Sequence, residues 1–324
     1  MGEKTGIAWT DHTFNPWIGC TKVSPGCDHC YAESSRPAAA MKIKWGLREP
    51  RHRTSKGNWN LPLRWNRAAQ EAGQRRLVFC ASLADVFDNE VSEQWREDLF
   101  ALIDATPFLT WLILTKRIGN AAAMIPGKDR HNVWIGASVV NQAEADRDIP
   151  KLMYTPAAVR FVSYEPALEP VDFRHWLAPT DGRTGLDWII VGGESDQGGV
   201  KARPFKVEWA RSVVAQCNAA GVPVFVKQLG SNPVDWCVNA LLDSYPQETE
   251  PGYCDIDAGH EGTRCAGRCK FMKDSAGGDP MEWPEGIRVR EFPPSEMRCA
   301  HCGYWFDSVL GKYGCPNCEG AGLR

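Results

Sequence analysis

Short apolar runs rich in β-branched residues recur along the chain from about Leu77 onward, separated by helix-like stretches. Within each run the apolar residues are continuous instead of alternating with polar ones. This pattern is typical of strands that are buried on both faces of a parallel sheet. The strands predicted in this way are Leu77–Ser82, Thr110–Thr115, Val133–Ser138, Val159–Ser163, Trp188–Gly192 and Val222–Lys227.

Two of the intervening stretches carry clear helix signals. Ser92 is a typical N-cap for an amphipathic stretch that Pro107 closes. Gly221 is a typical C-terminal residue for a helix over Val207–Ala220. Repeated strand–helix units predict an α/β fold, either a doubly wound sheet or a β/α barrel.

Polar residues or glycines follow almost every predicted strand. In a β/α barrel, functional groups gather where strands end, on the carboxyl face. The residues in question are Ser82 and Asp85, Lys116 and Arg117, Ser138, Glu165, Gly192-Gly193-Glu194, and Lys227 with Gln228. Their recurrence predicts one shared pocket, although each residue taken singly is explained equally well as a helix cap or turn former.

The length and charge of the chain narrow its class. Its 324 residues can bury a full core, and we expect a large α/β unit over residues 1–230. An irregular cysteine-containing extension over 231–297 should pack on it, followed by a separate module over 298–324. The formal net charge of −3 predicts no general attraction to polyanions. With no signal-peptide pattern and no membrane-length apolar run, we expect a cytoplasmic protein.

Cysteine is the most informative residue type in the chain. Thirteen cysteines in a reducing compartment point to metal ligation rather than to disulfides. Cys80 and Cys217 are exceptions, because their apolar or helix-like surroundings indicate core packing.

Cys20, Cys27 and Cys30 lie within eleven residues of each other, in a loop punctuated by proline and glycine. Three thiolates can hold a 4Fe–4S cluster and leave one iron open to a bound cofactor. The alternative is a structural zinc site in which His29 or His12 supplies the fourth ligand.

Two further groups of cysteines occur near the C-terminus. The spacing of Cys299, Cys302, Cys315 and Cys318 is that of a zinc ribbon. Cys254, Cys265 and Cys269, joined by His260 or Cys237, form a looser set that either holds another metal or consists of free thiols.

The segment from Lys42 to Arg76 contains ten Lys or Arg residues against Glu49 and Glu71. Tryptophans interleaved with these cations predict a nucleic-acid surface, with cations for phosphates and indoles for bases. The predicted contacts are Arg51, Arg53, Lys56, Trp59, Arg64 and Trp65. The alternative is a solvated basic face whose tryptophans anchor a long loop on the barrel.

Several motifs resemble the phage Gp37/Gp68 family, a radical-SAM-like group with a three-cysteine motif. The resemblance begins with WTDHTFNPWIGC at residues 9–20 and CDHCYAE at 27–33. It continues through ASLADVF at 81–87, LTKR at 114–117, SYEP at 163–166, VGGES at 191–195 and VKQLG at 226–230. It covers most of residues 5–295.

The resemblance implies a partial β/α barrel, of the radical-SAM TIM type, that holds a 4Fe–4S cluster and S-adenosylmethionine (SAM). Such an enzyme cleaves SAM reductively to a 5′-deoxyadenosyl radical. The basic segment, the zinc ribbon and the phage context together favour a nucleic-acid base or nucleotide as substrate, as in phage DNA modification. The expected partners are DNA or a nucleotide, an electron donor such as flavodoxin or ferredoxin, and a companion phage-encoded protein, in the host cytoplasm.

Two alternatives to this function remain open: a radical DNA-lesion repair enzyme, and a non-catalytic zinc-binding module for nucleic acid or protein. The chain also departs from the commonest radical-SAM pattern. Six residues instead of three separate Cys20 from Cys27, and His29 stands where an aromatic residue usually precedes the last cysteine. The motif Gly192-Gly193-Glu194 follows a late strand instead of the second one.

Charge alone identifies candidate contacts to the cofactor without ranking them. The SAM carboxylate could meet Lys116, Arg117, Arg203 or Lys227, and its amine or ribose hydroxyls could meet Asp85, Glu165 or Glu194.

Overall fold

A computed structural model describes residues 5–127, 130–177, 185–234 and 272–293, together with the backbone of two short antiparallel strands, β12 (Met297–Arg298) and β13 (Trp305–Phe306). The predicted ligands of the zinc ribbon and of the looser cysteine set lie outside the described residues. They are Cys299, Cys302, Cys315, Cys318, Cys254, Cys265 and Cys269.

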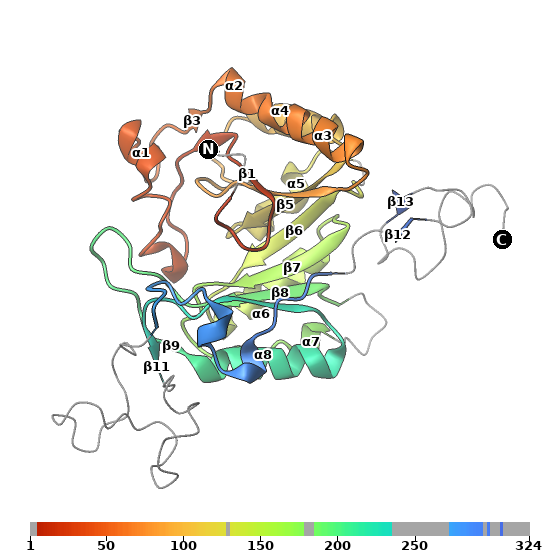
Figure 1. The fold of residues 1–324 in the computed structure, drawn as a ribbon. Helices are drawn as coiled ribbons and strands as arrows, with labels where there is room; N and C mark the ends of the chain where they lie inside the picture. The colour runs from red at the N-terminus through yellow and green to blue at the C-terminus, as the bar shows by residue number, and fades with distance from the viewer. Residues whose placement is uncertain are drawn as a thin grey trace, which may run out of the picture.

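Seven parallel strands form one sheet that curls into a half-barrel, like part of a TIM barrel (Figure 1). In spatial order they are β1 (His12–Phe14), β4 (Arg76–Cys80), β5 (Leu109–Thr115), β6 (Val133–Ser138), β7 (Val159–Tyr164), β8 (Trp188–Gly192) and β10 (Val224–Gln228). The spatial order follows the chain order. Because every pair is parallel, all seven carboxyl ends lie at the same edge of the sheet.

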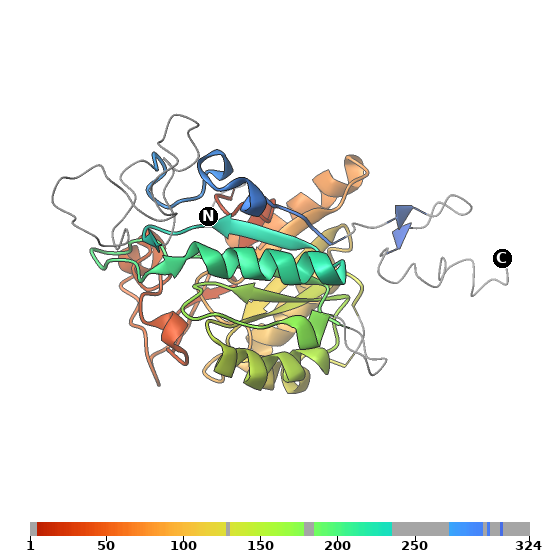
Figure 2. The ribbon, with the colours of Figure 1, turned by 90° about the horizontal axis from the view of Figure 1, so that it is seen from below.

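Helices cover the convex face of the half-barrel (Figures 1 and 2). They are α3 (Leu61–Glu71), α4 (Glu93–Asp104), α5 (Ile118–Met124), α6 (Gln142–Met153), α7 (Arg174–Leu177) and α8 (Val207–Ala220). The Ser92 side chain accepts a hydrogen bond from the backbone N–H of Trp95 at the start of α4, as predicted. Gly221 ends α8 with a φ of 67°, also as predicted.

Alternate residues of each strand face two different layers. On β5, Trp111 and Ile113 belong to the cluster packed under the helices, whereas Leu112 belongs to a second cluster on the concave side. This second cluster is rich in aromatic rings, including Phe161 and Trp188. Burial on both faces explains why the strands read as continuous apolar runs.

Shorter elements surround the half-barrel. Between β1 and α3 the chain forms β2 (Trp17–Ile18), η1 (Pro25–Cys27), α1 (Arg36–Ala40), β3 (His52–Arg53) and α2 (Lys56–Trp59); β2 pairs antiparallel with β3. Strand β9 (Phe205–Lys206) pairs with β11 (Pro233–Val234). The segment 272–293 contains η3 (Pro280–Glu282) and η4 (Glu285–Ile287) and runs along β10, where Val226 N–H donates to Val289 O at 2.8 Å.

The strands predicted from sequence all form, with ends displaced by up to two residues. Strand β4 ends at Cys80, so Ser82 lies beyond it, and β10 begins at Val224 instead of Val222. Strand β1 was not predicted, because three residues are too few to show a pattern. Cys80 and Cys217 are fully buried, which confirms their predicted place in the core. Among the described helices, none has the length and apolar character needed to cross a bilayer.

Candidate functional site

The carboxyl ends of the strands and the loop that carries the first three cysteines enclose a cavity of about 420 Å³. That volume lies within the range of roughly 300–1,000 Å³ found for small-molecule sites. Twelve of the predicted site residues line it: Cys20, Cys27, Cys30, Ser82, Asp85, Lys116, Arg117, Ser138, Glu165, Gly193, Glu194 and Lys227. The structure therefore brings together residues that are spread over more than 200 positions of the sequence.

The cysteine loop, residues 19–31, is seated directly on the strand ends. Gly19 adopts a φ of +114°, which residues with a side chain rarely do. Ser24 caps η1 by accepting a hydrogen bond from the N–H of Gly26. A Cβ atom on Gly26 would lie 2.7 Å from Cγ1 of Val140, which follows β6. Only glycine fits where the loop passes over this part of the sheet.

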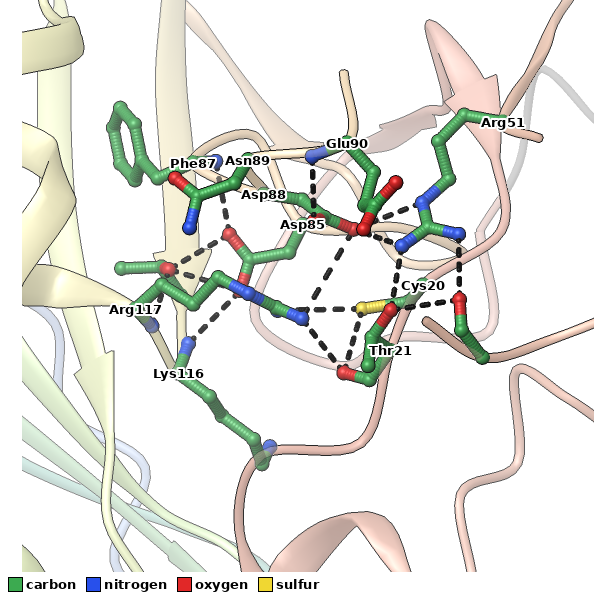
Figure 3. Close-up of polar contacts among 12 residues, drawn as sticks. Cys20, Thr21, Arg51, Asp85, Phe87, Asp88, Asn89, Glu90, Lys116 and Arg117 are labelled. Atoms are coloured by element: carbon green, nitrogen blue, oxygen red, sulfur yellow. Dashed lines mark hydrogen bonds and ion pairs between the residues drawn. The ribbon is translucent and has the colours of Figure 1, made fainter. Parts of the chain in front are cut away.

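Arg117 joins the cysteine loop to the end of β5 (Figure 3). Its Nη1 donates to Cys20 Sγ at 3.4 Å and to Asp85 Oδ2 at 3.2 Å, and its Nη2 donates to Thr21 O at 2.7 Å. The carboxylate of Asp85, which is 5% exposed, also accepts from the Thr115 hydroxyl and from the Lys116 backbone N–H. Asp85 is thus a buried anchor that orients the guanidinium toward the sulfur.

Burial dominates the electrostatics of this corner. It raises the pKa of the Cys20 thiol to about 11; the charge of Asp85 raises it further, while Arg117 opposes the shift. For Arg117, burial is the largest single cause and lowers the pKa, but Asp85, Cys20 and Asp88 together raise it by more, so the net pKa lies above its ordinary value.

A second ion pair, between Arg51 and Asp88, also holds the cysteine loop in place. Arg51 Nη2 lies 2.8 Å from Asp88 Oδ2, with both side chains almost fully buried. The same Nη2 donates to the Thr21 hydroxyl at 2.7 Å, so this pair holds the residue next to Cys20 (Figure 3). The Arg51 side chain is therefore buried and bonded inside the protein. The prediction that it contacts nucleic acid is wrong, because its guanidinium does not face solvent.

Glu194, after β8, holds the other end of the loop. Arg203 binds its carboxylate with Nε at 3.0 Å and Nη2 at 2.7 Å, and His29 Nδ1 lies 2.9 Å from Oε2. Arg203 also donates to Pro25 O at 3.0 Å. Although burial alone would raise the pKa of Glu194, the bonds from Arg203 and His29 lower it below its ordinary value. Arg203 is thus adjacent to the cavity without lining it.

A third group lies on the ends of β5, β6, β7 and β10, where the Lys116 side chain also passes close to Gly26 of the cysteine loop. Lys227 Nζ is 2.7 Å from Glu165 Oε1, which also accepts from the Gln228 side chain at 3.1 Å. Lys116 Nζ donates to Ser138 Oγ at 2.9 Å. Gly192 does not line the cavity, but a Cβ on it would lie 3.2 Å from Glu165 Oε1, so this glycine makes room for the carboxylate.

The donor set at the loop is chemically suited to an iron–sulfur cluster, since three thiols line one cavity with a cation beside one of them. Within the described residues, no three His, Cys, Asp or Glu side chains converge as the ligands of a single metal ion do. A four-iron cluster spaces its ligands on separate irons and needs no such convergence. The histidines of the zinc alternative are engaged elsewhere: His29 binds Glu194, and the His12 ring stacks on Trp65 at 4.3 Å.

The predicted nucleic-acid residues divide between interior and surface. Trp65 is 4% exposed, and Trp59 lies under the Arg53 guanidinium at 4.2 Å from its centroid, so both indoles pack against the protein. Lys56 and Arg64 are exposed on α2 and α3. The tryptophans thus anchor the segment, as the alternative interpretation expected, while some cations remain at the surface.

Sequence reasoning missed several residues that build the site. Asn15 is 1% exposed; its side chain donates to the Ser82 hydroxyl at 2.9 Å and accepts from the Leu83 N–H at 2.7 Å. Asp88 and His29 were not expected to anchor the loop. The available sequence signal was the position of Asn15 between Phe14 and Trp17. A polar side chain among residues of the core needs a hydrogen-bond partner, because an unpaired polar group is costly there.

Comparison with known proteins identifies the family of the chain, but the description of that family states no activity. A family model described as "Protein of unknown function (DUF5131)" matches residues 4–277. No curated protein and no solved structure matches the chain.

Proposed function

Because the chain belongs to the DUF5131 family, whose function is unknown, we propose its activity from the cavity: a radical SAM enzyme that holds a 4Fe–4S cluster on Cys20, Cys27 and Cys30. The observation that carries the proposal is that three thiols and a set of polar strand-end residues line the same cavity of a partial β/α barrel. When bound, the reduced cluster supplies the electron that cleaves SAM and releases a 5′-deoxyadenosyl radical.

The contacts in the cavity distinguish residues with polar atoms left for a ligand from residues that hold the loop. Arg117 and Arg203 are already engaged by carboxylates and loop carbonyls, and Glu194 is engaged by Arg203. We assign these three residues to positioning.

Lys116, Glu165 and Lys227 have capacity left for a ligand. The described residues take one of the three N–H donors of Lys116, through Ser138. We assign Lys116 to the SAM carboxylate. We assign Glu165, held by Lys227 at 2.7 Å, to the SAM amine.

For the substrate we propose a nucleic-acid base or nucleotide. The support is the exposed cations of the segment that adjoins the cysteine loop, Lys56 and Arg64 among them. A DNA-lesion repair enzyme would use the same cavity, and product analysis separates it from a modifying enzyme. A zinc-binding module is the non-catalytic alternative.

Anaerobic reconstitution with iron and sulfide tests the proposal. We expect a brown protein with about four irons per chain, and 5′-deoxyadenosine after addition of dithionite and SAM. The triple variant with Cys20, Cys27 and Cys30 changed to Ala should bind no iron. Cys217→Ala is the matched control, because that thiol is buried in α8 away from the cavity, and it should load normally. A colourless wild type that contains only zinc would refute the proposal.

A further inference from the structure

Arg117 is the one cation that the described residues place in direct contact with a cysteine sulfur. Its Nη1 lies 3.4 Å from Cys20 Sγ, and its side chain is 9% exposed (Figure 3). A guanidinium remains charged at any pH at which the protein is folded. The contact is therefore a fixed positive charge aimed at a sulfur in a largely dehydrated corner.

The direction of this charge is determined by the fold. The Asp85 carboxylate accepts hydrogen bonds from Arg117, Thr115 and the backbone N–H of Lys116, and Thr21 O accepts one from Arg117 Nη2. The neighbouring Asp88 is 4.0 Å from Arg117 Nη2 but is bound more closely by Arg51 at 2.8 Å. Of the four charged side chains Arg51, Asp85, Asp88 and Arg117, it is Arg117 that donates a hydrogen bond to the sulfur of Cys20.

Hydrogen bonds and charges at the ligand sulfurs are a principal means by which proteins adjust the reduction potential of an iron–sulfur cluster. Reduction adds one negative charge to the cluster. A cation at a ligand sulfur stabilises the reduced form and raises the potential, whereas a nearby carboxylate lowers it.

We infer that Arg117 and Asp85 act as an opposed pair of positioning residues that set the reduction potential of the centre held by Cys20. This inference rests on the proposed function, because it requires the cluster. It assigns Arg117 to the cluster and not to the carboxylate of SAM, which was one of the roles open to it from sequence.

The inference predicts shifts of opposite sign. Arg117→Met removes the positive charge and should lower the midpoint potential, so that at a fixed potential the ratio of reduced to oxidised cluster falls about tenfold, equal to about 59 mV for one electron. Asp85→Asn removes the negative charge, keeps an acceptor for Arg117, and should raise the potential. Arg117→Lys keeps the charge and should lie between wild type and Arg117→Met.

The test is a redox titration of anaerobically reconstituted protein with dithionite in the absence of SAM, with the reduced cluster measured by electron paramagnetic resonance at each potential. Arg130→Met is the matched control: this buried arginine pairs with Asp104 at 2.8 Å before the amino end of β6, and its loss should leave the potential unchanged. Potentials equal to wild type, or shifts of the same sign in Arg117→Met and Asp85→Asn, would overturn the inference. If Arg117→Met fails to load iron, Asp85→Asn and Arg117→Lys still decide it. A wild type without iron would refute the proposed function instead.

Discussion

Removing the Arg203 side chain tests how strongly the Glu194–Arg203 pair holds the cysteine loop on the barrel. Arg203 binds the carboxylate through Nε, Nη2 and its backbone N–H, at 2.7 to 3.0 Å. The Glu194 side chain is 7% exposed and that of Arg203 is 25% exposed. Breaking one partner of a buried pair costs about 3–5 kcal/mol. Since water reaches part of Arg203, we expect Arg203→Met to lower the free energy of unfolding by about 2–3 kcal/mol.

Urea unfolding of a double-mutant cycle with Glu194→Gln isolates the pair itself. We expect a coupling energy of about 1–2 kcal/mol, because the two side chains share a bidentate contact. Lys201→Met is the control: this lysine pairs with Asp196 but is 83% exposed, and its loss should change stability by less than about 0.5 kcal/mol. A coupling energy no larger than the effect of Lys201→Met would refute the reasoning.

The same pair predicts a pH dependence with a defined sign. The folded pKa of Glu194 lies below its ordinary value of 4.5. A carboxylate with a lowered folded pKa stabilises the protein above its unfolded pKa, and this stabilisation is lost as the pH falls through the folded pKa. The stability difference between wild type and Arg203→Met should therefore be full at neutral pH and shrink below about pH 4.5.

Two further predictions concern the loop and the basic segment. Gly26→Ala places a Cβ 2.7 Å from Val140 Cγ1 and should reduce the iron bound per chain after reconstitution. The control is Gly57→Ala, whose Cβ would have its nearest neighbour 3.8 Å away and which should bind as much iron as wild type. Equal iron content in Gly26→Ala and wild type would contradict the close contact of the loop with Val140 after β6. Charge reversal at the exposed Lys56 and Arg64 should weaken binding of single-stranded DNA in fluorescence anisotropy and lower the slope of log K against log salt by about 1–2. An unchanged slope would argue against a nucleic-acid surface there.

Much of the fold could be predicted because its strands are buried on both faces. Continuous apolar runs mark such strands regardless of what packs on them, and Ser92 and Gly221 mark helix ends by local hydrogen bonding. Strand β1 escaped prediction because its three residues acquire their strand character only by pairing with β4. Its His12 pairs with Val78, a partner 66 positions away.

The residues that line the site could be predicted from the sequence, but the role of each residue could not. Residue type and position after a strand identified the polar lining of the cavity, because parallel strands bring their carboxyl ends together. Charge alone could not separate Lys116 from Arg117, which are adjacent in sequence. Only the structure shows that Arg117 is committed to Asp85, Thr21 and Cys20, whereas Lys116 extends to Ser138.

The seating of the cysteine loop explains why so many of the motifs in this sequence belong to one site. Cys20 meets Arg117 after β5, and Tyr31 donates to the backbone carbonyl of Ser82 beyond β4 at 2.8 Å. Gly26 lies against Val140 after β6, and His29 meets Glu194 after β8. Four strands thus fix one loop of thirteen residues, residues 19–31. We therefore expect a change at any of these strand ends to shift the thiols, so each motif constrains the same cavity even where its side chains touch no ligand.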